Sequence, residues 1–251
     1  VYAGGVSVQN FLNISGRELI LKGFPVDGFY SYRFGGLDDN GAPTFPALGN
    51  EYATEYDRLQ DLLVYEGTKV PKTYGGFGTQ VSFKGFTLTS NFTYKAGYKV
   101  RLLSLYPNGI YVPLPNENMR GEFADRWRQP GDRTNIPALS DDPMKIDMPY
   151  GAANLLLPYG DGSTLYQLYD LSDERTAKGD HIRWQSLALS YNCPKRWISA
   201  IGMRSMTIRF QVQNLAVWTF DGKLKGQDPE QVSQIGMPSL TSYNIGINIG
   251  F

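Results

Sequence analysis

The last ten residues carry the clearest alternation of apolar and polar positions in the chain. One face of this segment is apolar and the other is small or polar. The apolar positions are Tyr243, Ile245, Ile247, Ile249 and Phe251, and those between them are Ser242, Asn244, Gly246, Asn248 and Gly250. Successive side chains of a strand point to opposite faces. The pattern therefore predicts a strand over Ser242–Phe251.

The same period of two predicts further strands upstream. Residues 77–98 read as a hairpin that reverses at Lys84-Gly85, because a glycine beside a polar residue suits a tight turn with positive φ. Residues 206–213 alternate with Arg209 and two glutamines on one face, which suits contact with water rather than a dry core. Weaker alternation predicts strands over His181–Asn192 and Val6–Ile14.

The connections between these six predicted strands differ greatly in length. One is the two-residue Lys84-Gly85 turn and another the modest 193–204 stretch, whereas the other three are long, at about 15–76, 99–180 and 219–239. Short turns on one side and long loops on the other are typical of a transmembrane β-barrel, with the short turns periplasmic. The prediction is all-β, with strands one, three and five rising and two, four and six descending.

Composition narrows the function classes. The chain has 24 Lys plus Arg and 24 Asp plus Glu, so its formal charge of zero argues against a nucleic-acid partner and against purely electrostatic attachment to acidic lipid. Cys193 is the single cysteine, which excludes an internal disulfide framework. No apolar run approaches the ~20 residues of a membrane-spanning helix, but barrel strands span with short alternating segments instead.

No catalytic or metal-binding constellation is predicted, and no cofactor. His181 is the only histidine, and it lacks a recognisable third group for a catalytic triad. Cys193 precedes a proline at a strand end, where a small half-buried residue is the simpler interpretation. The Asp38-Asp39-Asn40-Gly41 segment suggests calcium only weakly, since position 49 is Gly where an EF-hand loop has Glu, and a turn is the alternative.

Several loop phrases, in this order, resemble the SusC/RagA family of TonB-linked outer-membrane transporters. They are Lys22-Gly23-Phe24-Pro25, residues 30–38 (YSYRFGGLD), Tyr65-Glu66-Gly67 with Pro71 and 75–77, residues 82–86 (SFKGF), Arg126-Trp127 with 130–132 (PGD), Asp180-His181-Ile182-Arg183, Gln213-Asn214-Leu215, residues 226–230 (GQDPE) and the closing strand. Their collinear order extends over nearly the whole chain.

The resemblance implies a section of a roughly 22-stranded transmembrane β-barrel whose plug is absent from this chain. Residues 1–251 would be the C-terminal part of the barrel of a longer protein, because the chain begins without Met or a signal-peptide pattern. By resemblance, the transporter would import oligosaccharides or peptides across the outer membrane of a Gram-negative, Bacteroidetes-like cell. TonB would act through the absent plug, and a SusD-like surface lipoprotein would cover the outer loops.

Two sets of residues are candidates for function. The closing strand resembles the signal read by the barrel-assembly machinery, through Tyr243, Ile245, Gly246, Ile247, Ile249 and Phe251. Tyr30, Tyr32, Trp127 and Tyr150 are candidate outer-loop contacts for a ligand or partner, with packing of the loops as the alternative. Trp197 and Trp218, at predicted strand ends, suit the membrane interface. A soluble glycan-binding β-sandwich and a passive porin-type barrel remain as alternative functions.

Overall fold

A computed structural model describes Pro25, residues 28–47, Asn50, and residues 55–106, 120–139, 165–232 and 239–251. The chain falls into two compact units, each built from two separate segments. Residues 71–98 and 178–251 form the strand unit, and residues 1–70 and 99–177 form the loop unit. Within the described residues, no helix has the length and apolar character needed to cross a membrane.

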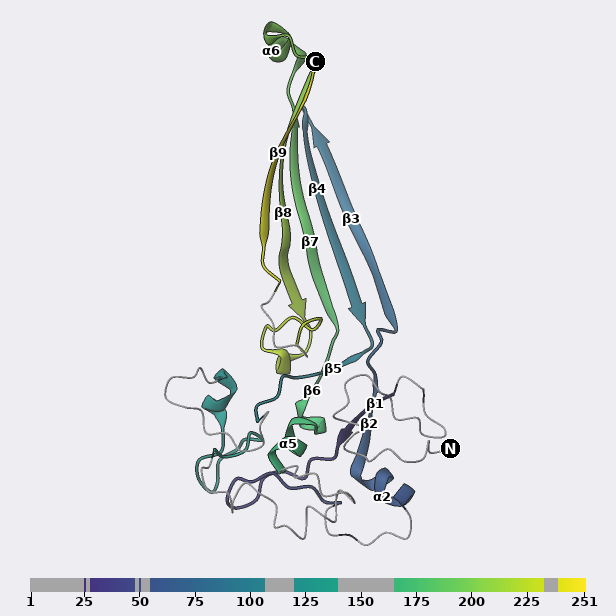
Figure 1. The fold of residues 1–251 in the computed structure, drawn as a ribbon, viewed down its shortest axis with the longest axis vertical. Helices are drawn as coiled ribbons and strands as arrows, with labels where there is room; N and C mark the ends of the chain where they lie inside the picture. Colours follow the sequence, from purple (N-terminus) through teal and green to yellow (C-terminus); the bar gives the residue numbers. More distant parts are fainter. Residues whose placement is uncertain are drawn as a thin grey trace. The chain divides into compact units, whose positions relative to one another are not determined.

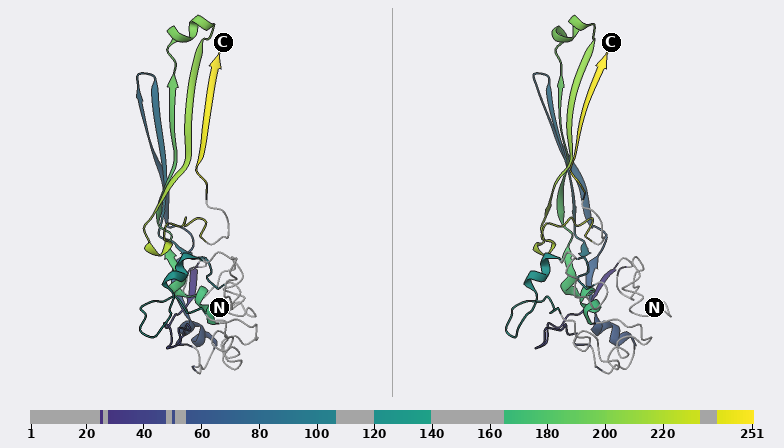
Figure 2. Two further views of the ribbon diagram at one scale, coloured as in Figure 1. Left: turned by 90° about the vertical axis from the view of Figure 1, so that its left-hand side faces the viewer. Right: turned by 60° about the vertical axis from the view of Figure 1, so that its left-hand side comes forward.

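The strand unit is a five-stranded antiparallel sheet in the order β3-β4-β7-β8-β9 (Figure 1). Its members are β3 (Thr73–Phe83), β4 (Phe86–Ala96), β7 (His181–Asn192), β8 (Ser205–Thr219) and β9 (Ser242–Gly250). Both views in Figure 2 show these strands side by side and twisted. The sheet confirms the hairpin, the 181–192 strand, the strand around 206–213 and the closing strand, and the predicted Val6–Ile14 strand lies outside the described residues.

The short connections all lie at one end of the sheet. Lys84 and Gly85 form the turn between β3 and β4, with positive φ of 46° and 88°, as a tight two-residue hairpin requires. Between β7 and β8 the chain forms α6 (Lys195–Ile198) and a single 3-10 turn. Gly202 ends that turn with φ of 78°.

An irregularity crosses the middle strands of the sheet at one level. The register of β7 shifts between Trp184 and Ser186 relative to both neighbours. In β8 the matching position is Asn214, which has a left-handed φ of 53°. Such bulges sharpen the local bend and twist of a sheet, and this one reverses the phase of the alternation in β7, where the apolar face passes from Leu187 to Trp184.

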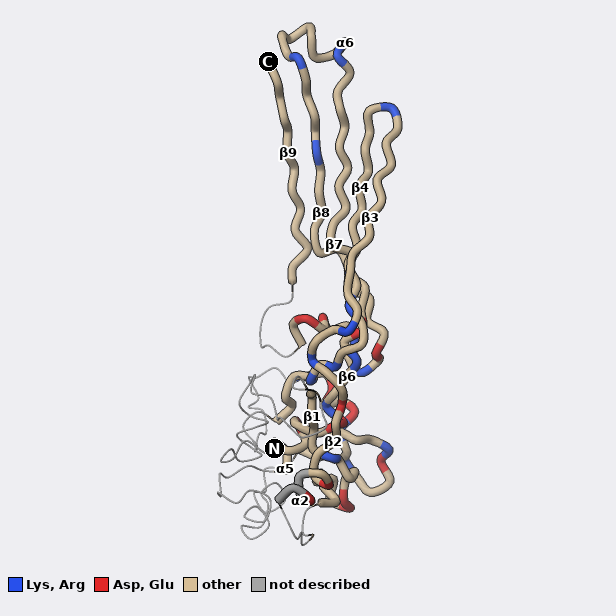
Figure 3. The backbone as a smooth tube through the Cα atoms, turned by 90° about the vertical axis from the view of Figure 1, so that its right-hand side faces the viewer, with Lys and Arg blue, Asp and Glu red and all other residues tan. Residues whose placement is uncertain are grey.

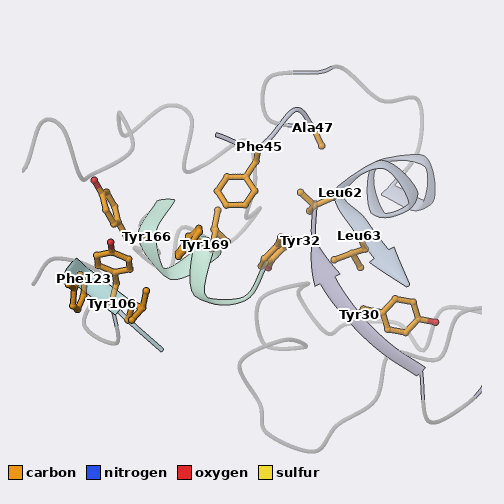
Figure 4. Close-up of a cluster of buried hydrophobic side chains, with 12 residues drawn as sticks. Tyr30, Tyr32, Phe45, Ala47, Leu62, Leu63, Tyr106, Phe123, Tyr166 and Tyr169 are labelled. Atoms are coloured by element: carbon orange, nitrogen blue, oxygen red, sulfur yellow. The ribbon is translucent and has the colours of Figure 1, made fainter. Parts of the chain in front are cut away.

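The loop unit contains two small sheets and short helices. β1 (Gly28–Tyr32) pairs with β2 (Leu63–Thr68), and β5 (Lys99–Arg101) pairs with β6 (Thr176–Lys178). The helices are α2 (Glu55–Leu62) and α5 (Leu165–Asp170). The unit has an aromatic-rich core, drawn in Figure 4, whose buried members are Tyr30, Tyr32, Phe45, Ala47, Leu62, Leu63, Leu105, Tyr106, Phe123, Tyr166, Leu168 and Tyr169.

Candidate functional site

One face of the sheet is a continuous apolar surface. Strand register aligns the apolar positions of neighbouring strands in rows, of which Leu88–Leu189–Phe210–Ile245 and Phe86–Tyr191–Ile208–Ile247 are two. Phe210 is 41% exposed and Ile245 77% exposed. Large contiguous apolar patches are rare on surfaces that face water and mark contact with a partner or a membrane. The apolar face is therefore the main candidate surface of this chain.

The opposite face is polar and hydrogen-bonded across strands. Asn91 Nδ2 donates to Ser186 Oγ at 3.0 Å, and Thr207 Oγ1 donates to Asn192 Oδ1 at 2.7 Å. Gln211 and Asn244 face each other on the same side. Polar-in and apolar-out alternation of this kind is the pattern of a barrel that crosses a membrane around a polar lumen.

Aromatic rings form a stacked ladder across four strands near the long-loop end. Phe77 and Phe92 have ring centroids 5.0 Å apart, Phe92 and Trp184 5.6 Å, and Trp184 and Trp218 6.3 Å, all within 20° of parallel. The indole Nε1 of Trp184 donates to Ser90 Oγ at 2.8 Å, so its one polar atom is satisfied. Amphipathic rings of this kind are enriched where a membrane meets water.

A second aromatic group lies at the short-turn end. Phe86 and Tyr191 are 4.3 Å apart, and Trp197 of α6 is 6.3 Å from Tyr191. Trp197 is 56% exposed. Aromatic residues thus flank the apolar rows at both ends, as in the girdles of outer-membrane barrels.

The height of the apolar band fits a bilayer. From Met206 at the short-turn end to Trp218, β8 advances twelve residues, of which Asn214 and Leu215 have no partner in β7, so ten residues add to the height. At ~3.3 Å per residue these cover about 33 Å along a strand. A tilt of about 40° reduces this to about 25 Å, the height of the apolar band of an outer-membrane barrel.

The closing strand β9 contributes its apolar face to this band. Tyr243, Ile245, Ile247 and Ile249 face the same side as their partners in β8, and Gly246 faces the polar side opposite Arg209. Phe251 follows the strand and is 77% exposed. Among the described residues β9 pairs only with β8, so its other edge is open to a further strand. Recognition of these residues during barrel assembly stays a prediction.

A charge cluster fixes the β8–β9 connection to the polar face. Arg183 Nη2 contacts both carboxylate oxygens of Asp228 at 2.7 Å and also contacts Glu230, while Lys95 binds Glu230 as well. Only 5% of the Arg183 side chain is exposed. Burial alone would raise the pKa of Glu230, but the hydrogen bond from Lys95 and the Arg183 charge lower it below its usual range. In the sequence, residues 226–230 stand out only as a family phrase, because no local pattern reports their contact with Arg183.

The structure places Tyr30 and Tyr32 inside the loop unit. They are 4% and 1% exposed and belong to the aromatic core (Figure 4). Arg101 supports their strand by donating from Nη2 to the Tyr30 carbonyl at 2.8 Å and to Ser31 Oγ at 3.0 Å. Burial raises the pKa of Tyr30 to about 12. This burial favours the packing interpretation of the two tyrosines.

Of the other two candidate loop aromatics, Trp127 and Tyr150, only Trp127 lies among the described residues. Trp127 is half-buried, and its ring lies directly against Gly41, where a Cβ would clash. The Trp127 amide donates to the Ile136 carbonyl at 2.9 Å. Tyr150 lies outside the described residues. Packing is thus also the observed contact of Trp127.

A buried charged network holds the loop unit together. Asp170 accepts hydrogen bonds from the amides of Leu105 at 2.8 Å and Tyr106 at 2.7 Å, and Arg175 lies between it and Glu122. Burial raises the pKa of Asp170 to about 6, although the two amides and Arg175 act in the opposite direction. The network links three segments of the loop unit, although the buried Nε of Arg175 has no hydrogen-bond partner among the described residues.

The residues considered above for catalysis or metal binding make hydrogen bonds that stabilise the local fold. His181 is 2% exposed, with Nδ1 2.8 Å from the Gly179 carbonyl and 3.3 Å from the Tyr98 hydroxyl. Cys193 is half-buried, and its amide donates to the Met206 carbonyl. Asp38 Oδ1 accepts the amides of residues 40 and 42 at 2.8 Å, which is a turn. The described residues contain no group of three or more His, Cys, Asp or Glu that could hold a metal.

Comparisons with known proteins give the same picture. No family model matches the chain. A TonB-dependent receptor P3 from Formosa agariphila is 19% identical over 247 residues, which cover 93% of this chain and 21% of the receptor. A structure of the RagAB peptide importer in its open-open state matches with a TM-score of 0.63 and 19% identity, covering all of this chain and 25% of that chain. A RagAB peptide transporter structure matches with a TM-score of 0.59 and 20% identity, covering 89% and 22%.

These matches confirm the predicted resemblance and the predicted fold class. The relatives are a receptor and importers rather than enzymes. The chain spans about a fifth of the length of the curated relative, in line with a part of a barrel. In sequence and in fold, the chain resembles the C-terminal barrel section of a SusC/RagA-like TonB-dependent transporter.

Proposed function

We propose that this chain is the C-terminal barrel section of an outer-membrane, TonB-dependent importer of oligosaccharides or peptides. The observation that carries the proposal is the continuous apolar face of five registered strands, backed by a polar face. A membrane-crossing strand must present apolar side chains to lipid on one side and can present polar ones to an aqueous lumen on the other. The chain contributes wall and outer loops and performs no covalent chemistry.

Partners follow from the relatives rather than from contacts within this chain. The solved neighbours are structures of a RagAB peptide importer or transporter, which supports a peptide cargo and a second component. We infer a SusD-like surface lipoprotein over the outer loops, together with the plug and upstream barrel of the same transporter. Energy would come from TonB acting through that plug.

The two rival functions predict different surfaces. A soluble glycan-binding β-sandwich needs its apolar face covered by a second sheet, yet Val81, Phe210 and Ile247 are 60%, 41% and 56% exposed. A passive porin shares the apolar band but would carry solute without an energy source. The exposed apolar band favours a membrane protein over a soluble one. Dependence on TonB then distinguishes an importer from a passive porin.

The test is uptake by the whole transporter in a Bacteroidetes host. Cells that lack its gene are complemented with the intact gene, with or without TonB, and given labelled peptides or oligosaccharides. We expect outer-membrane localisation and uptake of one cargo class, lost without TonB. Uptake that persists without TonB would support the porin, and recovery of the protein in the soluble fraction would refute the membrane placement.

A further inference from the structure

The neutral net charge conceals a strong separation of charge along the strand unit. All 24 carboxylate side chains lie outside residues 67–116, 181–220 and 231–251. These three segments include every strand of the large sheet and all of its short connections. Figure 3 shows no red along β3, β4, β7, β8 and β9, whereas blue marks the short turns that join these strands. The short-turn end is therefore purely cationic in its side chains.

Four cations make up this end, which we call the cationic rim: Lys84, Lys195, Arg196 and Arg204. All four side chains are exposed, and no ion pair links any of them to a carboxylate of the described chain. Unpaired like charges on one rim repel each other unless an anion lies nearby. The rim therefore favours an anionic partner.

Backbone hydrogen bonds tie the short connections at this end to the neighbouring strands. The Asn192 amide donates to the Gly85 carbonyl at 2.8 Å, which joins the β3–β4 turn to the end of β7. The Arg204 amide donates to the Gly250 carbonyl at 2.7 Å, which joins the start of β8 to the end of β9. The rim is thus a fixed feature of the sheet.

The rim borders the apolar face through aromatic rings. The Arg196 guanidinium lies 5.7 Å from the Trp197 ring centroid, and the Lys84 ammonium lies 5.1 Å from that of Phe83. Long cationic side chains that rest on aromatic rings at the edge of an apolar surface keep their charged ends in water. An anion held there would lie at the boundary between hydrocarbon and water.

We propose that the cationic rim binds the headgroups of anionic phospholipids, such as phosphatidylglycerol, in the leaflet that surrounds the short turns. The inference rests on the membrane placement proposed above. A phospholipid fits better than a soluble anion because its acyl chains would cover the adjoining apolar rows while its phosphate meets the cations. Each Lys or Arg near an anionic surface contributes about 1 kcal/mol of attraction, or about fivefold in affinity.

The experiment uses the whole transporter reconstituted in vesicles of phosphatidylethanolamine with one quarter phosphatidylglycerol. Lipids that stay bound after transfer to detergent are counted by native mass spectrometry. The test variant carries Lys84→Gln, Lys195→Gln, Arg196→Gln and Arg204→Gln. The matched control removes the same charge from exposed positions elsewhere, with Lys72→Gln, Arg128→Gln, Arg133→Gln and Lys178→Gln.

We expect the unmodified transporter to retain phosphatidylglycerol preferentially, the test variant to lose this retention at least tenfold, and the control to stay within twofold. In the unmodified transporter, 1 M salt should weaken the preference, because salt screens exposed charges. No preference, or equal losses in both variants, would overturn the inference while co-flotation with vesicles still supports the membrane placement. Failure of the unmodified transporter to float with vesicles would overturn both.

Discussion

Replacing Phe210 with arginine should strongly destabilise the membrane-inserted barrel. Phe210 lies in the third of six apolar rows, counted from the short-turn end, and so near the middle of the ~25 Å band. An arginine on the lipid face at that depth costs about 2–4 kcal/mol. Since about 1.4 kcal/mol is a factor of ten, the ratio of folded to unfolded transporter should fall by about 30-fold to 1000-fold at equal denaturant.

The matched control is Gln213→Arg on the same strand. Gln213 is exposed on the polar face, opposite Ser186 and Ser242, so an added arginine there should change the free energy of unfolding by less than about 0.5 kcal/mol. Folded transporter in lipid vesicles would be measured by gel mobility without heating, across a urea series. If Phe210→Arg shifts the urea midpoint no more than Gln213→Arg does, the apolar face is not against lipid and the reasoning is wrong.

Three further predictions concern the outer end of the sheet and the loop unit. Arg183→Met should cost about 3–5 kcal/mol by leaving Asp228 without its cation, seen as faster amide exchange in the β8–β9 connection, whereas Arg209→Met on the same face should not change it. Because burial raises the pKa of Asp170 from 3.8 to about 6, its contribution to stability is fully present below pH 4 and is lost as the pH rises through 6. The loss of stability is up to about 3 kcal/mol, and it is measured as faster hydrogen exchange of the Leu105 and Tyr106 amides, which donate to Asp170. Asp170→Asn should abolish this pH dependence. Gly41→Ala should cost about 2 kcal/mol or more, since the added methyl must displace a tryptophan ring. Gly36→Ala, also at positive φ but with open space around it, should cost about 1 kcal/mol, and limited proteolysis of the loop compares the two.

Most strands of the large sheet were predictable from their alternation. The 181–192 strand and the closing strand agree with the structure to within one residue, and the Lys84-Gly85 turn is where the glycine indicates it. β8, however, continues to Thr219, well beyond the alternation at 206–213. Past the bulge at Asn214, residues 215–218 (LAVW) are all apolar, so the alternation disappears and a search for period two ends early.

For the loop unit, the sequence predicted long loops that could pack on each other, but not their strands and helices. Its small strands are held by contacts between distant residues, such as Arg101 on the Tyr30 carbonyl, which no local pattern reports. The burial of Tyr30 likewise depends on tertiary packing, so the sequence left ligand contact and packing as alternatives. The cationic rim was missed for a different reason, because a net charge of zero sums over acids and bases that the fold keeps apart.

Contact between the apolar face and lipid can be tested at two adjacent residues of the closing strand. Ile245 faces the apolar side and Asn244 the polar side. Each is replaced by a spin-labelled cysteine in the whole transporter, with Cys193→Ser to leave one thiol in this chain, and the protein is reconstituted in vesicles. We predict that relaxation by oxygen, which concentrates in lipid, exceeds relaxation by a water-soluble nickel complex at position 245, with the reverse order at 244. Equal nickel access at both positions would contradict the account.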